Sequence, residues 1–254
     1  MAFTDHYVEA IIRLQVSLWS ARARLGAGAD AEALHDLRIA VRRLRSLLVP
    51  VRAIAGMSPL REAAAQVGRL TTPSRDLEVM AGELASRGYL DAAAARRAKL
   101  QAHYARIAQA PALDTLFKAL DRWPAAFRAC KLGANPARLT AAVKKSLNKH
   151  LRKLHTALED PAFDRHQLRI LVKRTRYLTE AFPQLSPLSA KGSRALKAVQ
   201  AALGSWHDHH QWCLMGEVEP DLRPLRPAWE QASAAELKEA EVAIAALKRS
   251  LPRP

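Results

Sequence analysis

A stretch of 13 residues occurs twice in the chain, at His35–Leu47 and again at His166–Leu178. The two copies align without gaps, and eight of the 13 positions are identical. A ninth position, Arg42 in the first copy and Lys173 in the second, keeps its positive charge. A repeat of this kind indicates that each half of the chain builds a similar structural unit.

A second feature recurs further along each half. Asp76 follows His35 by 41 residues and comes after Arg75, while Asp208 follows His166 by 42 residues and comes after His207. We therefore expect each half to carry one basic helix and, later, a corner with a basic residue and an aspartate. Two four-helix halves in tandem are the simplest architecture that satisfies this pattern.

The composition favours helices throughout. The chain has only 10 glycines among its 254 residues, and no segment alternates between apolar and polar residues as a strand would. Proline and glycine divide it into segments that we expect to be helical, with the second starting after an Asp30 N-cap: about 4–25, 31–48, 58–87 with an interruption at 72–74, 91–109, 112–129, 137–158, 163–182, 188–215 and 228–250. The sequence predicts an all-α fold, one domain over 1–254, with a first four-helix half at 1–131 and a second at 132–254.

The positive charge is concentrated rather than dispersed. The chain carries 40 Lys and Arg against 24 Asp and Glu, a net charge of +16. Residues 35–52 hold five arginines and one acid, and residues 137–176 hold 11 basic residues and three acids, so these two windows supply +12. Clustering of this kind favours a polyanionic partner over a general solubility function.

The repeated segment places its basic residues on one face of a helix. At about 100° per residue, spacings of three, seven and ten residues fall within one narrow stripe. The first copy presents His35, Arg38, Arg42 and Arg45 on this stripe, and the second presents His166, Arg169, Lys173 and Arg176. Arg43 and Arg174 point away from it, and their role is open. Apolar residues such as Leu37, Leu44, Leu168 and Val172 form an adjoining stripe suited to a core.

Stacked like charges destabilise an isolated helix, so two matching helices of this kind indicate compensation by a bound anion. Arginine grips two phosphate oxygens at once, and histidine adds a donor that gains charge as pH falls. Neighbouring segments offer further basic faces that we expect to widen the same surface: Lys145, Lys149 and Arg152, and then Lys191, Arg194 and Lys197.

At these residues the sequence resembles the CHAD family, the conserved-histidine α-helical domain. The resemblance rests on a His-x-x-Arg-x-x-x-(Arg/Lys)-(Arg/Lys)-x-Arg helix in each half, read here from His35 and again from His166. The family's Leu-Gly-x-x-(basic)-Asp corner appears as Leu203–Asp208, whereas Thr71–Asp76 in the first half lacks the glycine. His207 stands where the family more often has Arg or Lys.

The resemblance implies two four-helix bundles related by a pseudo-two-fold axis, with a basic groove lined from both repeats. It also implies binding of inorganic polyphosphate and association with polyphosphate granules, without catalysis. Many members are fused to a triphosphate-tunnel domain. This length leaves no room for one, so we expect a free-standing protein.

Two other functions remain open from the residues alone. A nucleic-acid binder is compatible with the charge, but the basic stripes are poor in aromatic residues for base stacking, with only Tyr177 beside one. A metal-dependent phosphohydrolase would use His35-Asp36 and His207–His210. Against it, Asp36 becomes Gln167 in the repeat, and the surrounding arginines would oppose a cation.

The remaining expectations concern the cell. No apolar run is long enough to cross a membrane, and the first residues lack the pattern of a signal peptide. The two isolated cysteines, Cys130 and Cys213, suit a reducing compartment. We expect a cytoplasmic protein with no cofactor, no metal site and no membrane insertion. The oligomeric state is left open.

Overall fold

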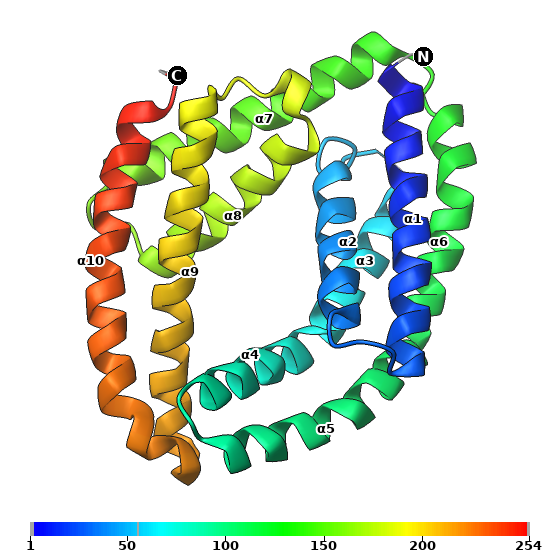
Figure 1. Cartoon of the computed structure of the whole chain (residues 1–254). Coiled ribbons are helices and arrows are strands. Elements are labelled where there is room, and N and C mark those ends of the chain that lie inside the picture. Colours follow the sequence, from blue (N-terminus) through cyan, green and yellow to red (C-terminus); the bar gives the residue numbers. More distant parts are fainter. Residues whose placement is uncertain (1–2, 55, 253–254) are drawn as a thin grey trace. The chain divides into compact units, whose positions relative to one another are not determined.

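The computed structural model describes residues 3–54 and 56–252, and over these residues it is helical with no strand (Figure 1). None of the helices in this part of the chain is long and apolar enough to cross a bilayer. Contacts divide the chain into two compact units, Met1–Val143 and Lys144–Pro254. One copy of the repeated basic segment lies in each unit.

The first unit contains six complete helices among its described residues, rather than the four expected for residues 1–131. They are α1 (Phe3–Ala27), α2 (Ala33–Leu47), α3 (Ser58–Leu70), α4 (Thr72–Ser86), α5 (Leu90–Ala108) and α6 (Pro111–Ala129). The segment 58–87 forms two helices because Pro73 lacks an amide hydrogen and cannot continue α3. It occupies the first turn of α4 instead, where no such hydrogen bond is needed.

The core of the first unit is built from helices that pair across the sequence. α1 packs against α2 and α5, α3 packs against α6, and α4 packs against α5. Tyr7 of α1 packs against two stacked rings of α6, with ring centroids 5.7 Å from Trp123 and 5.2 Å from Phe127. Its hydroxyl donates to the Leu47 carbonyl at 2.7 Å, which ties α1 to the end of α2. Burial raises the pKa of Tyr7, so the hydroxyl stays a neutral donor.

The second unit is built around one apolar core. Its helices are α7 (Pro136–Glu159, from Lys144 on), α8 (Arg165–Ala181), α9 (Ala190–Val218) and α10 (Arg226–Ser250), with short 3₁₀ turns at Pro183–Leu185 and Pro220–Leu225. Each of the four helices contributes to the core, through residues such as Leu154, Leu168, Leu203 and Leu247. α9 and α10 run side by side over most of their length (Figure 1).

The division between the units lies inside α7 rather than at the proline- and glycine-rich link at 131/132. Leu139 and Val143 in the first turns of α7 are buried, and contacts assign them to the first unit. The link itself is tight, because a Cβ on Gly133 would lie 1.9 Å from the Phe127 carbonyl oxygen. Glycine is required there by this close approach, not by flexibility.

The start of α2 differs from the expectation of an Asp30 N-cap. The helix begins at Ala33 after Glu32, whose side chain makes no capping hydrogen bond. Asp30 instead accepts from the Glu32 amide at 2.9 Å and pairs with Arg24 of α1 at 3.2 Å. The carboxylate therefore organises the turn that precedes the basic helix.

Candidate anion-binding helices

α2 carries the first basic stripe and has the two faces that its periodicity predicts. Leu34, Leu37, Val41 and Leu44 are buried in the core of the first unit. On the stripe, His35, Arg38 and Arg42 are partly buried and Arg45 is exposed, while Arg43, off the stripe, is exposed. Burial of the apolar face fixes the rotation of α2 about its axis.

Arg38 is held at the junction between α3 and α4. Its Nη1 donates to Thr71 Oγ1 at 2.9 Å, to Thr72 Oγ1 at 3.2 Å and to the Gly68 carbonyl at 3.4 Å. A cation near the C-terminal end of α3 also meets the negative end of the helix dipole. Burial lowers the pKa of the Arg38 guanidinium, and Asp76 opposes that effect.

Arg45 reaches the same region of α3. A Cβ added to Gly68 would lie 3.2 Å from Arg45 Nη1, so the absence of a side chain leaves room for this guanidinium. Two arginines of the stripe therefore lie against one short stretch of α3. Asp36, the single acid of α2, forms an ion pair with Arg24 of α1, with Asp36 Oδ2 2.5 Å from Arg24 Nη2.

α8 carries the second stripe, again above a buried apolar face. Leu168, Val172 and Leu178 are buried. His166 is exposed and Lys173 is partly buried, and Arg174, which corresponds to Arg43, is exposed. The side chains of Arg169 and Arg176 are only 16% and 17% exposed, which is less than we expected for an open basic face.

The arginines of α8 face carboxylates. Arg169 Nη2 lies 3.8 Å from Asp208 Oδ1 on α9, and Arg176 Nη1 lies 3.1 Å from Glu180 Oε1. The Arg176 guanidinium also lies over the Tyr177 ring, 4.8 Å from its centroid. The positive charge of this stripe is thus partly offset within the protein.

A histidine pair stands at the start of the second stripe. The rings of His166 on α8 and His207 on α9 have centroids 5.1 Å apart, and His207 Nδ1 lies 3.5 Å from Asp208 Oδ1. The His207 side chain is 16% exposed. His207 and Arg169 therefore both face Asp208, and His166 lies against the His207 ring.

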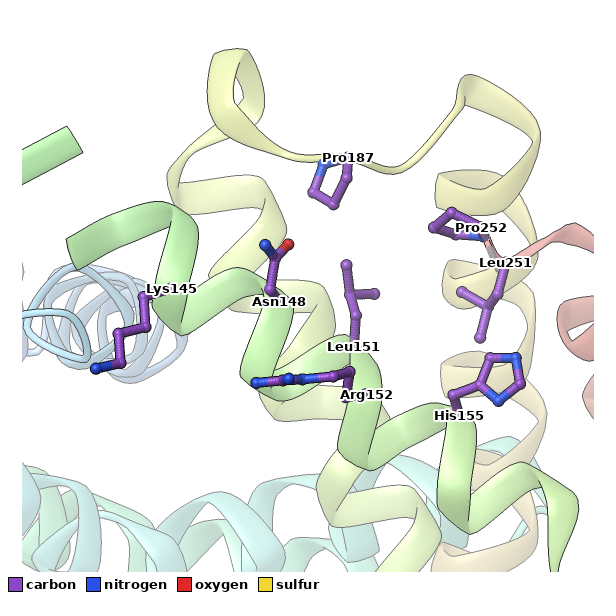
Figure 2. A pocket seen from close by; sticks show the side chains of 8 residues that line it. All are labelled: Lys145, Asn148, Leu151, Arg152, His155, Pro187, Leu251 and Pro252. Atoms are coloured by element: carbon purple, nitrogen blue, oxygen red, sulfur yellow. The ribbon is translucent and has the colours of Figure 1, made fainter. Parts of the chain in front are cut away.

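The further basic side chains are at the surface. Lys145, Lys149 and Arg152 on α7, and Lys191, Arg194 and Lys197 on α9, are all exposed. Lys145 and Arg152 also line a cavity of about 470 Å³ within the second unit, whereas Lys149 does not (Figure 2).

The expected corner at Leu203–Asp208 is not a corner. These residues lie inside α9, which runs without a break from Ala190 to Val218. Gly204 alone costs a helix only about 1 kcal/mol and does not end it. The matching segment of the first unit does break, between α3 and α4, because it contains Pro73.

His209 and His210 contact different partners. His209 Nδ1 lies 2.7 Å from Glu236 Oε2 of α10, and the His210 ring stacks on Trp206 with centroids 5.8 Å apart. Over residues 3–54 and 56–252, no three His, Cys, Asp or Glu side chains converge as a metal site would require.

Sequence reasoning missed the residues that hold the arginines in place. Thr71 and Thr72 align with Leu203 and Gly204 of the second half, so their hydroxyls are a departure from the motif that the sequence already displayed. Glu180 follows Arg176 by four residues, the spacing of a helical ion pair. The sequence displays both features, but the side chains that they contact follow only from the packing of the helices.

Comparison with known proteins agrees with this architecture. The family model of the CHAD domain matches residues 10–215. Among solved structures, the CHAD domain from the plant Ricinus communis is similar with a TM-score of 0.69 and 23% identity, covering 99% of this chain and 92% of that one. PptA from Streptomyces chartreusis is similar with a TM-score of 0.58 and 18% identity, covering 98% and 99%.

At these identities the solved structures establish the fold alone. A search of curated proteins found no match. The family model, however, spans most of the chain, including both basic helices. The chain belongs to the CHAD domain family.

Proposed function

We propose that this protein is a non-catalytic binder of inorganic polyphosphate, with the basic stripes of α2 and α8 as its principal contacts. The observation that carries the proposal is the duplicated stripe, because each copy keeps four basic or histidine positions beside a buried apolar face. Arginine and lysine in this spacing match an anion with charge at short, regular intervals. Lys145, Lys149, Arg152, Arg194 and Lys197 are proposed to add exposed, non-specific contacts.

The surroundings of the stripes favour a phosphate polymer over nucleic acid. Single-stranded nucleic acid gains much of its affinity from bases stacked on aromatic rings. Tyr177 lies on α8 next to the stripe, and its ring already faces the Arg176 guanidinium. Polyphosphate has no base to stack and needs only cations and hydrogen-bond donors.

Titration with polyphosphates of defined length, at several salt concentrations, tests the proposal. Affinity should rise with chain length because one long polymer contacts more than one basic helix, and it should fall steeply with salt because counterions are released. Equal affinity for long polyphosphate and for inorganic triphosphate, at one salt concentration, would contradict the proposal.

A pair of matched double variants locates the site. Arg45→Ala with Arg176→Ala should weaken binding of long polyphosphate by about 100-fold, since each removes a charge-assisted contact. Arg43→Ala with Arg174→Ala removes the same charge from the same helices, but off the stripe, and should cost several-fold at most. Circular dichroism checks that both variants keep their helicity.

Competition separates the two polyanions. Polyphosphate should displace DNA or RNA of matched charge, and the reverse displacement should be weaker. The proposal extends to the cell, where a fluorescent fusion should collect on polyphosphate granules and the Arg45→Ala/Arg176→Ala variant should remain diffuse in the cytoplasm.

A further inference from the structure

The second unit contains a cavity that the polyphosphate proposal leaves unexplained. It measures about 470 Å³ and lies between α7, the segment before α9 and the end of α10. This volume falls in the range of small-molecule sites, about 300–1,000 Å³. Polyphosphate has no apolar group that could pack against an apolar wall, yet much of this cavity is apolar.

The lining has two distinct ends. Leu151, Pro187, Leu251 and Pro252 form an apolar end, with Asn148 pointing toward Pro187 from α7 (Figure 2). Lys145 and Arg152 extend toward the opposite side and form a cationic end (Figure 2). A ligand that fills both ends carries an apolar group at one end and negative charge at the other.

The walls are held by local hydrogen bonds and by a close helix approach. Ser189 caps α9 by accepting from the Gly192 amide at 3.0 Å, and the Leu188 amide donates to Ser186 Oγ at 3.3 Å. A Cβ on Gly192 would lie 3.1 Å from the Ser250 carbonyl oxygen, so the start of α9 sits directly against the end of α10. The cavity is therefore largely formed before any ligand arrives.

The electrostatics favour an anion. Among the described residues that line the cavity, none is an acid. The nearby Glu159 pairs with Lys248 at 2.6 Å and lies 3.9 Å from Nδ1 of His155, which lines the cavity. The Lys248 ammonium thus offsets the charge of this carboxylate, which reduces its repulsion of a phosphate at Lys145 and Arg152.

We propose that this cavity binds a nucleoside phosphate. Two proline rings and two leucines offer apolar surfaces for a base to pack against, and the Asn148 amide supplies a donor and an acceptor that match the edge of adenine. Lys145 and Arg152 hold the phosphates. The ligand is distinct from polyphosphate and shares with it only the basic face of α7.

Calorimetric titration of the whole protein with ATP, adenosine and inorganic triphosphate tests this assignment. ATP should bind about tenfold tighter than inorganic triphosphate at the same salt concentration, since only ATP fills the apolar end. Lys145→Ala should lower the affinity for ATP by about tenfold. Lys153→Ala removes the same charge from an exposed position of the same helix, outside the cavity and outside the proposed polyphosphate contacts, and should change ATP affinity by less than about twofold.

Asn148→Leu separates this site from the polyphosphate surface. This substitution should weaken ATP binding several-fold. It should leave the affinities for inorganic triphosphate and long polyphosphate unchanged, because it alters no charge. If the variant fails to fold, saturation-transfer NMR on the wild-type protein gives the same information, with saturation expected on the base protons of ATP. The proposal is overturned if ATP binds no tighter than triphosphate, if Lys153→Ala weakens ATP binding as much as Lys145→Ala does, or if the base protons receive no saturation. If the protein binds ATP as expected but does not bind long polyphosphate, the proposed function is contradicted and this inference is not.

Discussion

The two basic helices carry nearly the same sequence but stand in different electrostatic surroundings. In the first unit, Arg38 donates to two threonine hydroxyls and a backbone carbonyl. In the second unit its counterpart, Arg169, faces the Asp208 carboxylate at 3.8 Å. The motif therefore fixes which residues are presented, while the packed neighbours decide which hydrogen-bond and charge partners those residues meet.

The cause of this difference is visible at two aligned positions. Thr71 and Thr72 end one helix and begin the next, which places both hydroxyls beside Arg38. Leu203 and Gly204 occupy the same positions inside the unbroken α9, where Leu203 enters the core and Gly204 has no side chain to offer. The helix break thus adds two hydroxyl partners to the first arginine, on which the Asp76 carboxylate also acts, whereas Leu203 and Gly204 offer no hydroxyl to the second, which faces the Asp208 carboxylate.

The largest expected effect is on the stability of the first unit. Arg38→Ala removes three hydrogen bonds from a partly buried junction and should lower the free energy of unfolding by about 1–3 kcal/mol. Arg43→Ala, an exposed position on the same helix, should change it by less than about 0.5 kcal/mol. Urea unfolding of both variants measures the difference. Equal stability would mean that the junction does not depend on Arg38.

An intermediate effect is expected from the carboxylate of the second unit. Asp208→Asn removes the charge that faces Arg169 and His207, so affinity for polyphosphate should rise about two- to fivefold, with a steeper salt dependence. Asp36→Asn makes the same charge change on α2, where the carboxylate is turned to Arg24. Asp36→Asn should change the affinity for polyphosphate by less than about twofold. A decrease in affinity for Asp208→Asn would show that the aspartate positions Arg169 rather than offsetting it.

The smallest expected effect comes from the charge at the start of the second stripe. His207→Arg supplies a permanent positive charge beside Arg169 and Asp208, which should raise affinity for polyphosphate about twofold at pH 8. His6→Arg adds the same charge at an exposed position on α1 and should leave the affinity unchanged. Titration of both variants with polyphosphate measures the difference, and an unaltered affinity in His207→Arg would remove His207 from the site.

Much of the fold could be read from local pattern. The spacing of Leu37, Leu44, Leu168 and Val172 predicted the buried faces of α2 and α8, and burial confirms them. The helices of the second unit were located within a few residues of their observed bounds. The two compact units were harder to divide, because the buried contacts of Leu139 and Val143, and not the composition of the link, decide where the first unit ends.

The sequence by itself determined the all-helical architecture, the family, and the two stripes of cationic and histidine side chains, because helical periodicity relates residues only a few positions apart. Tertiary structure alone decided what those side chains touch. Arg38 and Thr71 are 33 residues apart, and the cavity joins Lys145 and Asn148 to Leu251 across the length of the second unit. Such contacts depend on how helices pack, and no local spacing encodes the distance between two helices.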